Sequence, residues 1–256
     1  MKIGYQTLTW ANYYKDYSVE EPIHQIKEAG FEGIEFIEPI EKLGKADFLQ
    51  SILSEVGLKP VSLSCGLNMD PNDTSDIEET KSRVDFAGKL GIENMMLCGG
   101  WLADGIKKEE NSYKILGDKL NICCEYAFGL NMNIAFHPHK NTIVETREDI
   151  ERLLEFTDKT KLCVDIAHLA ACGSNPAEVI KRFGKIITYI HLKDWDVELD
   201  DFVELGKGEV DITKCLSVLK EIGYKGWAVV ELDHTKKTPK ESARISADYL
   251  RKAGAI

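Results

Sequence analysis

Residues 162–194 read LCVDIAHLAACGSNPAEVIKRFGKIITYIHLKD, with a short apolar segment at each end and a longer stretch of helical periodicity between them. The segments Leu162–Asp165 and Ile187–His191 are rich in apolar and β-branched residues, which is typical of buried strands. A strand, a helix and a second strand in this order form the unit from which parallel α/β folds are built. The stretch therefore predicts one βαβ unit, with a polar residue ending each strand.

The same alternation recurs along the whole chain. It predicts eight strands, near Lys2–Gln6, Gly33–Ile37, Pro60–Cys65, Asn94–Cys98, Asn133–His137, Leu162–Asp165, Ile187–His191 and Ala228–Glu231. Eight such units close naturally into a (β/α)8 barrel, and barrels of this kind reach the 256 residues of this chain as one unit. We therefore expect an α/β fold of the TIM-barrel class, with residues 1–256 forming a single domain.

Composition and charge exclude several classes of protein. The net charge of −11 comes without the clustered Lys and Arg that nucleic-acid binding requires. The start, Met1–Tyr5, lacks the features of a signal peptide, and no apolar stretch approaches the ~18 residues of a membrane span. Seven cysteines without a Cys-x-x-Cys pair indicate reduced thiols. We expect a cytoplasmic protein with neither nucleic acid nor membrane as partner, and homo-oligomerisation stays open.

Polar side chains end four consecutive predicted strands. The strand ends read Phe136-His137-Pro138-His139, Val164-Asp165-Ile166-Ala167-His168, Ile190-His191-Leu192-Lys193-Asp194 and Val230-Glu231-Leu232-Asp233. In a barrel these ends meet at one rim, where the active site lies. A mixed set of imidazoles and carboxylates suits a divalent ion, and acids gathered without a cation would repel one another. We therefore predict one divalent metal at the C-terminal mouth, with manganese, zinc, cobalt, iron(II) and magnesium as candidates.

Five stretches resemble the xylose isomerase-like barrel superfamily, whose members are often called sugar phosphate isomerases/epimerases. They are Gly30-Phe31-Glu32-Gly33-Ile34-Glu35, Val164-Asp165-Ile166-Ala167-His168, Ile190-His191-Leu192-Lys193-Asp194, Gly206-Lys207-Gly208-Glu209-Val210-Asp211 and Val229-Val230-Glu231-Leu232-Asp233. The resemblance covers nearly the whole chain. It implies one metal ion held by Asp165, His191, Glu231 and a fifth-strand residue, which is His137 or, if the register slips by two, His139. It also implies that His168 reaches the substrate.

Within this superfamily the chain most resembles the inosose dehydratases, through residues 137–146 and Thr9-Trp10-Ala11-Asn12. That group usually carries Gly where Asn141 stands. The superfamily's isomerases and epimerases place a Glu on the fifth strand, so a histidine there argues against a two-carboxylate 3-epimerase mechanism. Its three-zinc DNA-repair endonucleases need histidines where this chain has Glu35 and Cys65, and the negative charge of this chain is wrong for DNA.

Together, the metal cluster and the resemblance indicate an enzyme that enolises a keto-cyclitol or keto-sugar, most closely an inosose dehydratase-like lyase. Lys193 and His168 are the candidates for proton transfer, and Glu231 would act with Glu145 in orienting substrate hydroxyls. Lys193 could instead be a solvent-facing loop charge. Two alternatives stay open: a keto-sugar or sugar phosphate isomerase or epimerase of the same fold, and a non-catalytic sugar-binding barrel or complex subunit.

Further substrate contacts are expected around the same rim. Trp10 and Trp101 follow the first and fourth strands, where flat rings would cover a sugar, with packing against the barrel as the alternative. Glu35 ends the second strand and would bind the substrate or a neighbouring lysine. His139 and Glu145 would contact the substrate, or else bond each other and fix their loop.

Overall fold

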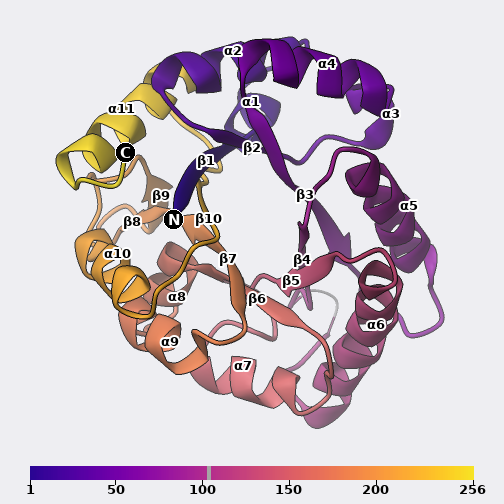
Figure 1. Cartoon of the computed structure of the whole chain (residues 1–256). Coiled ribbons are helices and arrows are strands. Elements are labelled where there is room, and N and C mark those ends of the chain that lie inside the picture. The colour runs from indigo at the N-terminus through magenta and orange to yellow at the C-terminus, as the bar shows by residue number, and fades with distance from the viewer. Residues whose placement is uncertain (103–104) are drawn as a thin grey trace.

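In the computed structural model, which describes residues 1–102 and 105–256, eight parallel strands close into a barrel with helices around it (Figure 1). The barrel strands are β1 (Lys2–Gln6), β2 (Gly33–Phe36), β3 (Lys59–Leu67), β4 (Asn94–Gly99), β5 (Asn133–Phe136), β6 (Lys161–Asp165), β7 (Ile187–Leu192) and β10 (Trp227–Val230). Strand β1 pairs with both β2 and β10, so the first and last barrel strands seal the ring. The predicted TIM-barrel fold is confirmed, and the eight predicted strands are all present.

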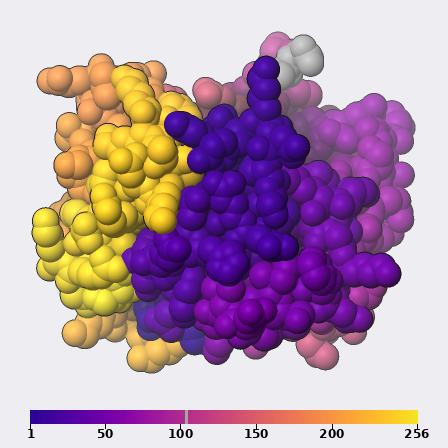
Figure 2. Space-filling model, turned by 90° about the horizontal axis from the view of Figure 1, so that it is seen from above, coloured from indigo at the N-terminus to yellow at the C-terminus, as the bar shows by residue number. Residues whose placement is uncertain are grey.

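Helices connect the strands and cover the outside of the barrel. They are α1 (Leu8–Tyr13), α2 (Glu20–Ala29), α3 (Ile40–Leu43), α4 (Ala46–Val56), α5 (Ser75–Lys89), α6 (Glu110–Phe128), α7 (Arg147–Leu154), α8 (Ile166–Ala171), α9 (Pro176–Phe183), α10 (Ile212–Glu221) and α11 (Pro239–Lys252). Figure 2 shows the yellow C-terminal segment against the indigo N-terminal one, and Arg251 of α11 donates to the carbonyl of Ala29 in α2. None of the described helices is long and apolar enough to cross a membrane.

A small hairpin that the sequence did not predict follows β7. It consists of β8 (Asp194–Asp196) and β9 (Asp201–Val203), which pair antiparallel. Asp194 fastens the hairpin to the loop 206–211, because its carboxylate accepts hydrogen bonds from the backbone N–H groups of Gly206 (2.8 Å) and Gly208 (3.0 Å). Strands of three residues are too short for an alternating pattern to stand out in the sequence.

Candidate metal centre

Four polar side chains converge inside the mouth of the barrel. His137 directly follows β5, Asp165 ends β6, His191 lies in β7 and Glu231 directly follows β10. One ligand atom from each lies within 4.8 Å of the others, and none of the four residues is more than 5% exposed. Strand register sets Asp165 directly beside His191. The strand ends that the sequence placed at one rim therefore form a single cluster, which we call the ligand cluster.

Five buried atoms of the ligand cluster form no hydrogen bond with any described residue. They are both ring nitrogens of His137, Oδ2 of Asp165, and Nδ1 of His191 and Oε2 of Glu231, which lie in close contact with each other. Nε2 of His137 lies 3.5 Å from Oδ2 of Asp165 and 3.8 Å from Oε2 of Glu231. Buried polar atoms without partners cost stability, and imidazole nitrogens with carboxylate oxygens are ligands of divalent metals. The donor set therefore fits one divalent cation.

Backbone and side-chain donors hold the opposite atoms of the two carboxylates. Oδ1 of Asp165 caps α8 by accepting from the N–H groups of Ala167 (2.8 Å) and His168 (2.9 Å). Oε1 of Glu231 accepts from Nζ of Lys193 at 3.1 Å. Each carboxylate is thus fixed through one oxygen and leaves its other oxygen for the ligand cluster, which is how outer contacts orient metal ligands.

Glu35 lies beneath the ligand cluster and is fully buried. Its carboxylate accepts hydrogen bonds from Nε2 of Gln6 (3.0 Å), the hydroxyl of Tyr189 (2.9 Å) and Nε2 of His191 (2.9 Å). The bond between Nε2 and Glu35 fixes the ring and leaves Nδ1 of His191 on the side of the ligand cluster, where a metal-binding histidine presents its ligand atom. The structure therefore corrects the prediction that Glu35 contacts the substrate: it points into the barrel and orients His191.

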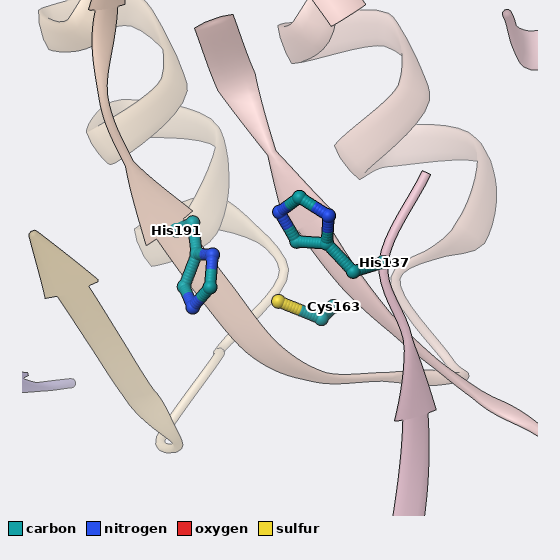
Figure 3. A group of neighbouring side chains, drawn as sticks. All are labelled: His137, Cys163 and His191. Atoms are coloured by element: carbon teal, nitrogen blue, oxygen red, sulfur yellow. The ribbon is translucent and has the colours of Figure 1, made fainter. Parts of the chain in front are cut away.

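Cys163 forms a second grouping with two of the same residues, His137 and His191 (Figure 3). It lies two residues before Asp165 on β6, and alternate residues of a strand face the same side. Burial raises the pKa of the Cys163 thiol to about 12. A thiol must lose its proton to bind a metal, so the set that contains the two carboxylates is the better candidate.

Lys193 is fully buried beside the ligand cluster, so it is not a solvent-facing loop charge. Its Nζ lies 2.9 Å from Oδ1 of Asp233 and 3.2 Å from Nε2 of His168, in addition to the contact with Glu231. Burial opposes the charge, but Glu231 and Asp233 outweigh it and raise the pKa of Lys193. Burial and the Lys193 charge lower the pKa of His168 well below its usual value. A charged ammonium therefore donates to a neutral imidazole.

A cavity of about 240 Å³ adjoins the ligand cluster at the mouth of the barrel. His137 and Glu231 belong both to the cluster and to the cavity wall, and Gln6, Trp101 and His139 also line it. Lys193 and His168 are not among the residues that line it. A small ligand in this cavity would contact two of the four candidate metal ligands.

The two histidines of the fifth strand end have different positions. His137 belongs to the ligand cluster, whereas His139 lies in the cavity wall. The centre of the His139 ring lies 3.7 Å from that of His168 and 4.7 Å from that of Trp101. Burial, with His137 beside it, lowers the pKa of His139 to about 4, so its imidazole is neutral. Trp101 is 44% exposed and lines the cavity. Contact of Trp101 and His139 with a substrate stays a prediction.

Two other expected substrate contacts have different roles in the structure. Trp10 is fully buried, and its Nε1 donates to Gln25 at 2.9 Å. Helix α1 begins at Leu8, two residues after the end of β1, and carries the ring into the core. Packing, the alternative, is thus confirmed for Trp10. Glu145 bonds Lys108 (2.6 Å) and the backbone N–H of Asn141 (2.6 Å). It fixes its loop, although with these partners rather than with a histidine.

Sequence reasoning missed Phe202 of β9. Nζ of Lys193 lies 4.1 Å from the centre of its ring, and the ring of His168 lies 4.5 Å away. The side chain therefore covers the buried ammonium and imidazole on one side. A single aromatic residue in an acidic loop gives no sequence signal for such a role.

Comparisons with known proteins agree with this geometry. Residues 23–253 match the family described as xylose isomerase-like TIM barrel. An inosose dehydratase from Clostridium botulinum (strain Alaska E43 / Type E3) is 26% identical, over 100% of this chain and 98% of that protein. One from Clostridium tetani (strain Massachusetts / E88) is 31% identical over 57% of this chain and 56% of that protein.

Among solved structures, the IolI protein with a bound zinc atom superposes with a TM-score of 0.82 and 24% identity, covering 99% of this chain and 98% of that one. At this identity the likeness speaks for the fold. The family match extends over most of the residues and agrees with the five sequence motifs. This chain belongs to the xylose isomerase-like TIM barrel family.

Proposed function

We propose that this protein is a metal-dependent lyase that dehydrates an inosose-like keto-cyclitol. The observation that carries the proposal is the set of unpartnered buried donor atoms beside a small cavity. Full-length relatives named inosose dehydratase, including one from Geobacillus kaustophilus (strain HTA426) at 26% identity, support the substrate class.

His137, Asp165, His191 and Glu231 would hold one divalent ion, with manganese, zinc, cobalt and magnesium to be tested. Two imidazoles and two carboxylates form a donor set that several of these ions accept. Bound there, such an ion supplies Lewis-acid polarisation of the substrate carbonyl, which favours loss of the neighbouring C–H proton.

Lys193 and His168 are proposed to move the two protons that a dehydration requires. The neutral imidazole of His168 accepts the proton taken from carbon, and the ammonium of Lys193 donates one to the departing hydroxyl, which leaves as water. A proton then passes from Nε2 of His168 to Nζ of Lys193, which lie 3.2 Å apart, and returns the imidazole to its neutral form and the amine to its charged form. Because neither residue lines the cavity, we propose that Glu231, which lines it and bonds Nζ of Lys193 at 3.1 Å, relays protons between the substrate and this pair.

The cavity suits a small unphosphorylated ring. Its volume of about 240 Å³ is below the range of about 300–1,000 Å³ typical of drug-sized ligands. Trp101 and His139 line it, and flat rings pack well on the carbon skeleton of a cyclitol. No arginine is among the described residues that line it, so the wall offers no bidentate clamp for a phosphate.

The test is a metal analysis of the purified protein, followed by incubation with 2-keto-myo-inositol while enone absorbance is recorded. We expect one ion per chain and a rising ultraviolet signal, with both lost in Asp165→Asn. Metal without the signal would replace the lyase by a keto-sugar isomerase or epimerase, to be sought with a panel of keto-sugars. No metal even after soaking would overturn the site and favour a non-catalytic sugar-binding barrel.

A further inference from the structure

Gln6 carries an unpartnered polar atom in the wall of the cavity. The residue ends β1, lines the cavity and is only 1% exposed. Its side-chain oxygen Oε1 is buried and has no hydrogen-bond partner among residues 1–102 and 105–256. Buried acceptors in folded proteins are almost always paired, so an unpaired one in a cavity wall calls for a donor from outside the chain.

Glu35 determines which way the amide of Gln6 points. Nε2 of Gln6 donates to Oε1 of Glu35 at 3.0 Å, while the other carboxylate oxygen accepts from Tyr189 and His191. Both oxygens of Glu35 thus act as acceptors here. A flipped amide would set the oxygen of Gln6 against the oxygen of Glu35, which is repulsive. Oε1 is therefore held as an acceptor on the side away from Glu35.

No described side chain of the cavity wall donates to Oε1 of Gln6. Leu8 and Ile37 are hydrocarbon, and the side chains of the wall that carry donors, on Ser64, Trp101 and the two histidines, form no hydrogen bond with it. A keto-cyclitol, in contrast, carries a hydroxyl group on every ring carbon other than the carbonyl carbon. We infer that Oε1 of Gln6 accepts a hydrogen bond from one ring hydroxyl of the substrate, an inference that rests on the proposed function.

This contact makes Gln6 a specificity-determining residue. A site built to bond a hydroxyl rejects an analogue that lacks it, because the protein acceptor is then left buried and unpaired. Gln6 also touches Glu35, and Glu35 orients His191. A substitution at Gln6 therefore has two routes to an effect, through the substrate or through the ligand cluster, and the test has to separate them.

The test compares 2-keto-myo-inositol with its monodeoxy analogues in metal-loaded wild type, Gln6→Met and Tyr189→Phe. We expect the wild type to disfavour one analogue by about ten- to hundredfold in kcat/KM and in Kd. Gln6→Met fills a similar volume without an oxygen, so this discrimination falls to near unity. Tyr189→Phe removes a different donor to Glu35 and keeps the discrimination. If Gln6→Met does not fold, Gln6→Asn, which draws the oxygen back by one methylene, serves in its place.

Equal discrimination in wild type and Gln6→Met would overturn the inference. So would an equal loss in Tyr189→Phe, because the effect would then pass through Glu35. Calorimetric Kd values keep this test separate from the proposed function. If the wild type binds the keto-cyclitol without dehydrating it, the proposed lyase activity is wrong. The Kd values for the analogues still show whether Gln6 contacts a ring hydroxyl. A wild type that does not bind it overturns both.

Discussion

Glu35 is a buried carboxylate whose effect would be seen in metal affinity. It accepts the Nε2 proton of His191, so Glu35→Gln would offer an amide donor where an acceptor is needed and disturb the histidine tautomer. We expect metal affinity to fall by about 10- to 100-fold, measured by competition with a chelator. Glu38→Gln is the matched control, because Glu38 is equally buried but bonds Thr7 and Tyr17. Unchanged affinity in Glu35→Gln would contradict the orienting role.

Asn141 occupies a backbone conformation that few residues tolerate. Its φ of +68° lies in the left-handed region, which glycine and asparagine adopt most readily. This explains why asparagine can stand where the inosose dehydratases usually carry glycine. Asn141→Val should lower the free energy of unfolding by about 1–2 kcal/mol, whereas Asn141→Gly should change it little.

Urea unfolding measures both Asn141 variants. Asn131, with a φ of +59° two residues before β5, is the companion site. Asn131→Val should show a similar loss of stability. A penalty at Asn141 without one at Asn131 would mean that contacts, rather than the backbone angle, set the preference.

Helix α7 depends on Asp149 for its first turn. Asp149 forms a capping box with Thr146 and pairs with Lys108 at 2.8 Å. Burial opposes ionisation, but the bonds from Lys108 and Tyr113 outweigh it and lower the pKa of Asp149. Because the folded pKa lies below the unfolded value of about 3.9, the stabilisation is complete above that value. It is lost as the pH falls through the folded pKa.

Asp149→Asn should therefore lower stability at neutral pH and weaken the dependence of stability on acid pH. The urea midpoint, followed from about pH 2 to about pH 7, measures both effects. Thr146→Ala removes the hydroxyl cap, at a cost of about 0.5–2 kcal/mol, but keeps the titrating group. It should retain the acid dependence. If the urea midpoint fell equally at acid pH in Asp149→Asn and in wild type, Asp149 would not be the source of the acid dependence.

The loop 206–211 packs too closely against β8 to admit a side chain at Gly208. A Cβ atom there would overlap the carbonyl oxygen of Trp195 and meet Oδ1 of Asp194 at 2.6 Å. Gly208→Ala should cost about 1–3 kcal/mol of stability and speed proteolysis of the loop. A Cβ atom at Gly88 in α5 would meet no atom within 4 Å, so Gly88→Ala should raise the free energy of unfolding by about 1 kcal/mol. Chemical denaturation should show a lower free energy of unfolding for Gly208→Ala and a higher one for Gly88→Ala. An unchanged free energy of unfolding in Gly208→Ala would refute the close packing.

Strand existence could be predicted from the sequence, whereas the depth of a side chain could not. The apolar strand segments are visible directly, and Asp165, His191 and Glu231 follow because parallel strand ends meet at one rim, while the choice between His137 and His139 stayed open. Glu35 lies next to the last residue of β2, but its long side chain reaches inward to His191. Trp10 follows a strand, but α1 begins too soon for the ring to reach the mouth. Both errors depend on distances across the barrel, which a linear pattern does not contain.

In the whole molecule, a bound ion would join residues from four barrel strands or the loops that directly follow them. An ion that binds only the folded chain stabilises it, by about 2.7 kcal/mol at a hundred times its Kd. For a chain of this size that corresponds to a rise in Tm of roughly 5–10 °C. Scanning calorimetry with and without a chelator measures the shift. His137→Ala should abolish it, and an undiminished shift in that variant would locate the ion elsewhere.

The bond between His191 and Glu35 crosses the barrel and joins two halves of the chain. The C-terminal half provides the metal ligands, and the N-terminal half provides the carboxylate that orients one of them. All four residues of the ligand cluster lie between 137 and 231, whereas Glu35 and Gln6 come from the first two strands. A chain severed after α6 would place every ligand on one fragment and the orienting carboxylate on the other. Tight metal retention would then require reassembly of the two fragments, so the ion itself would report their complementation.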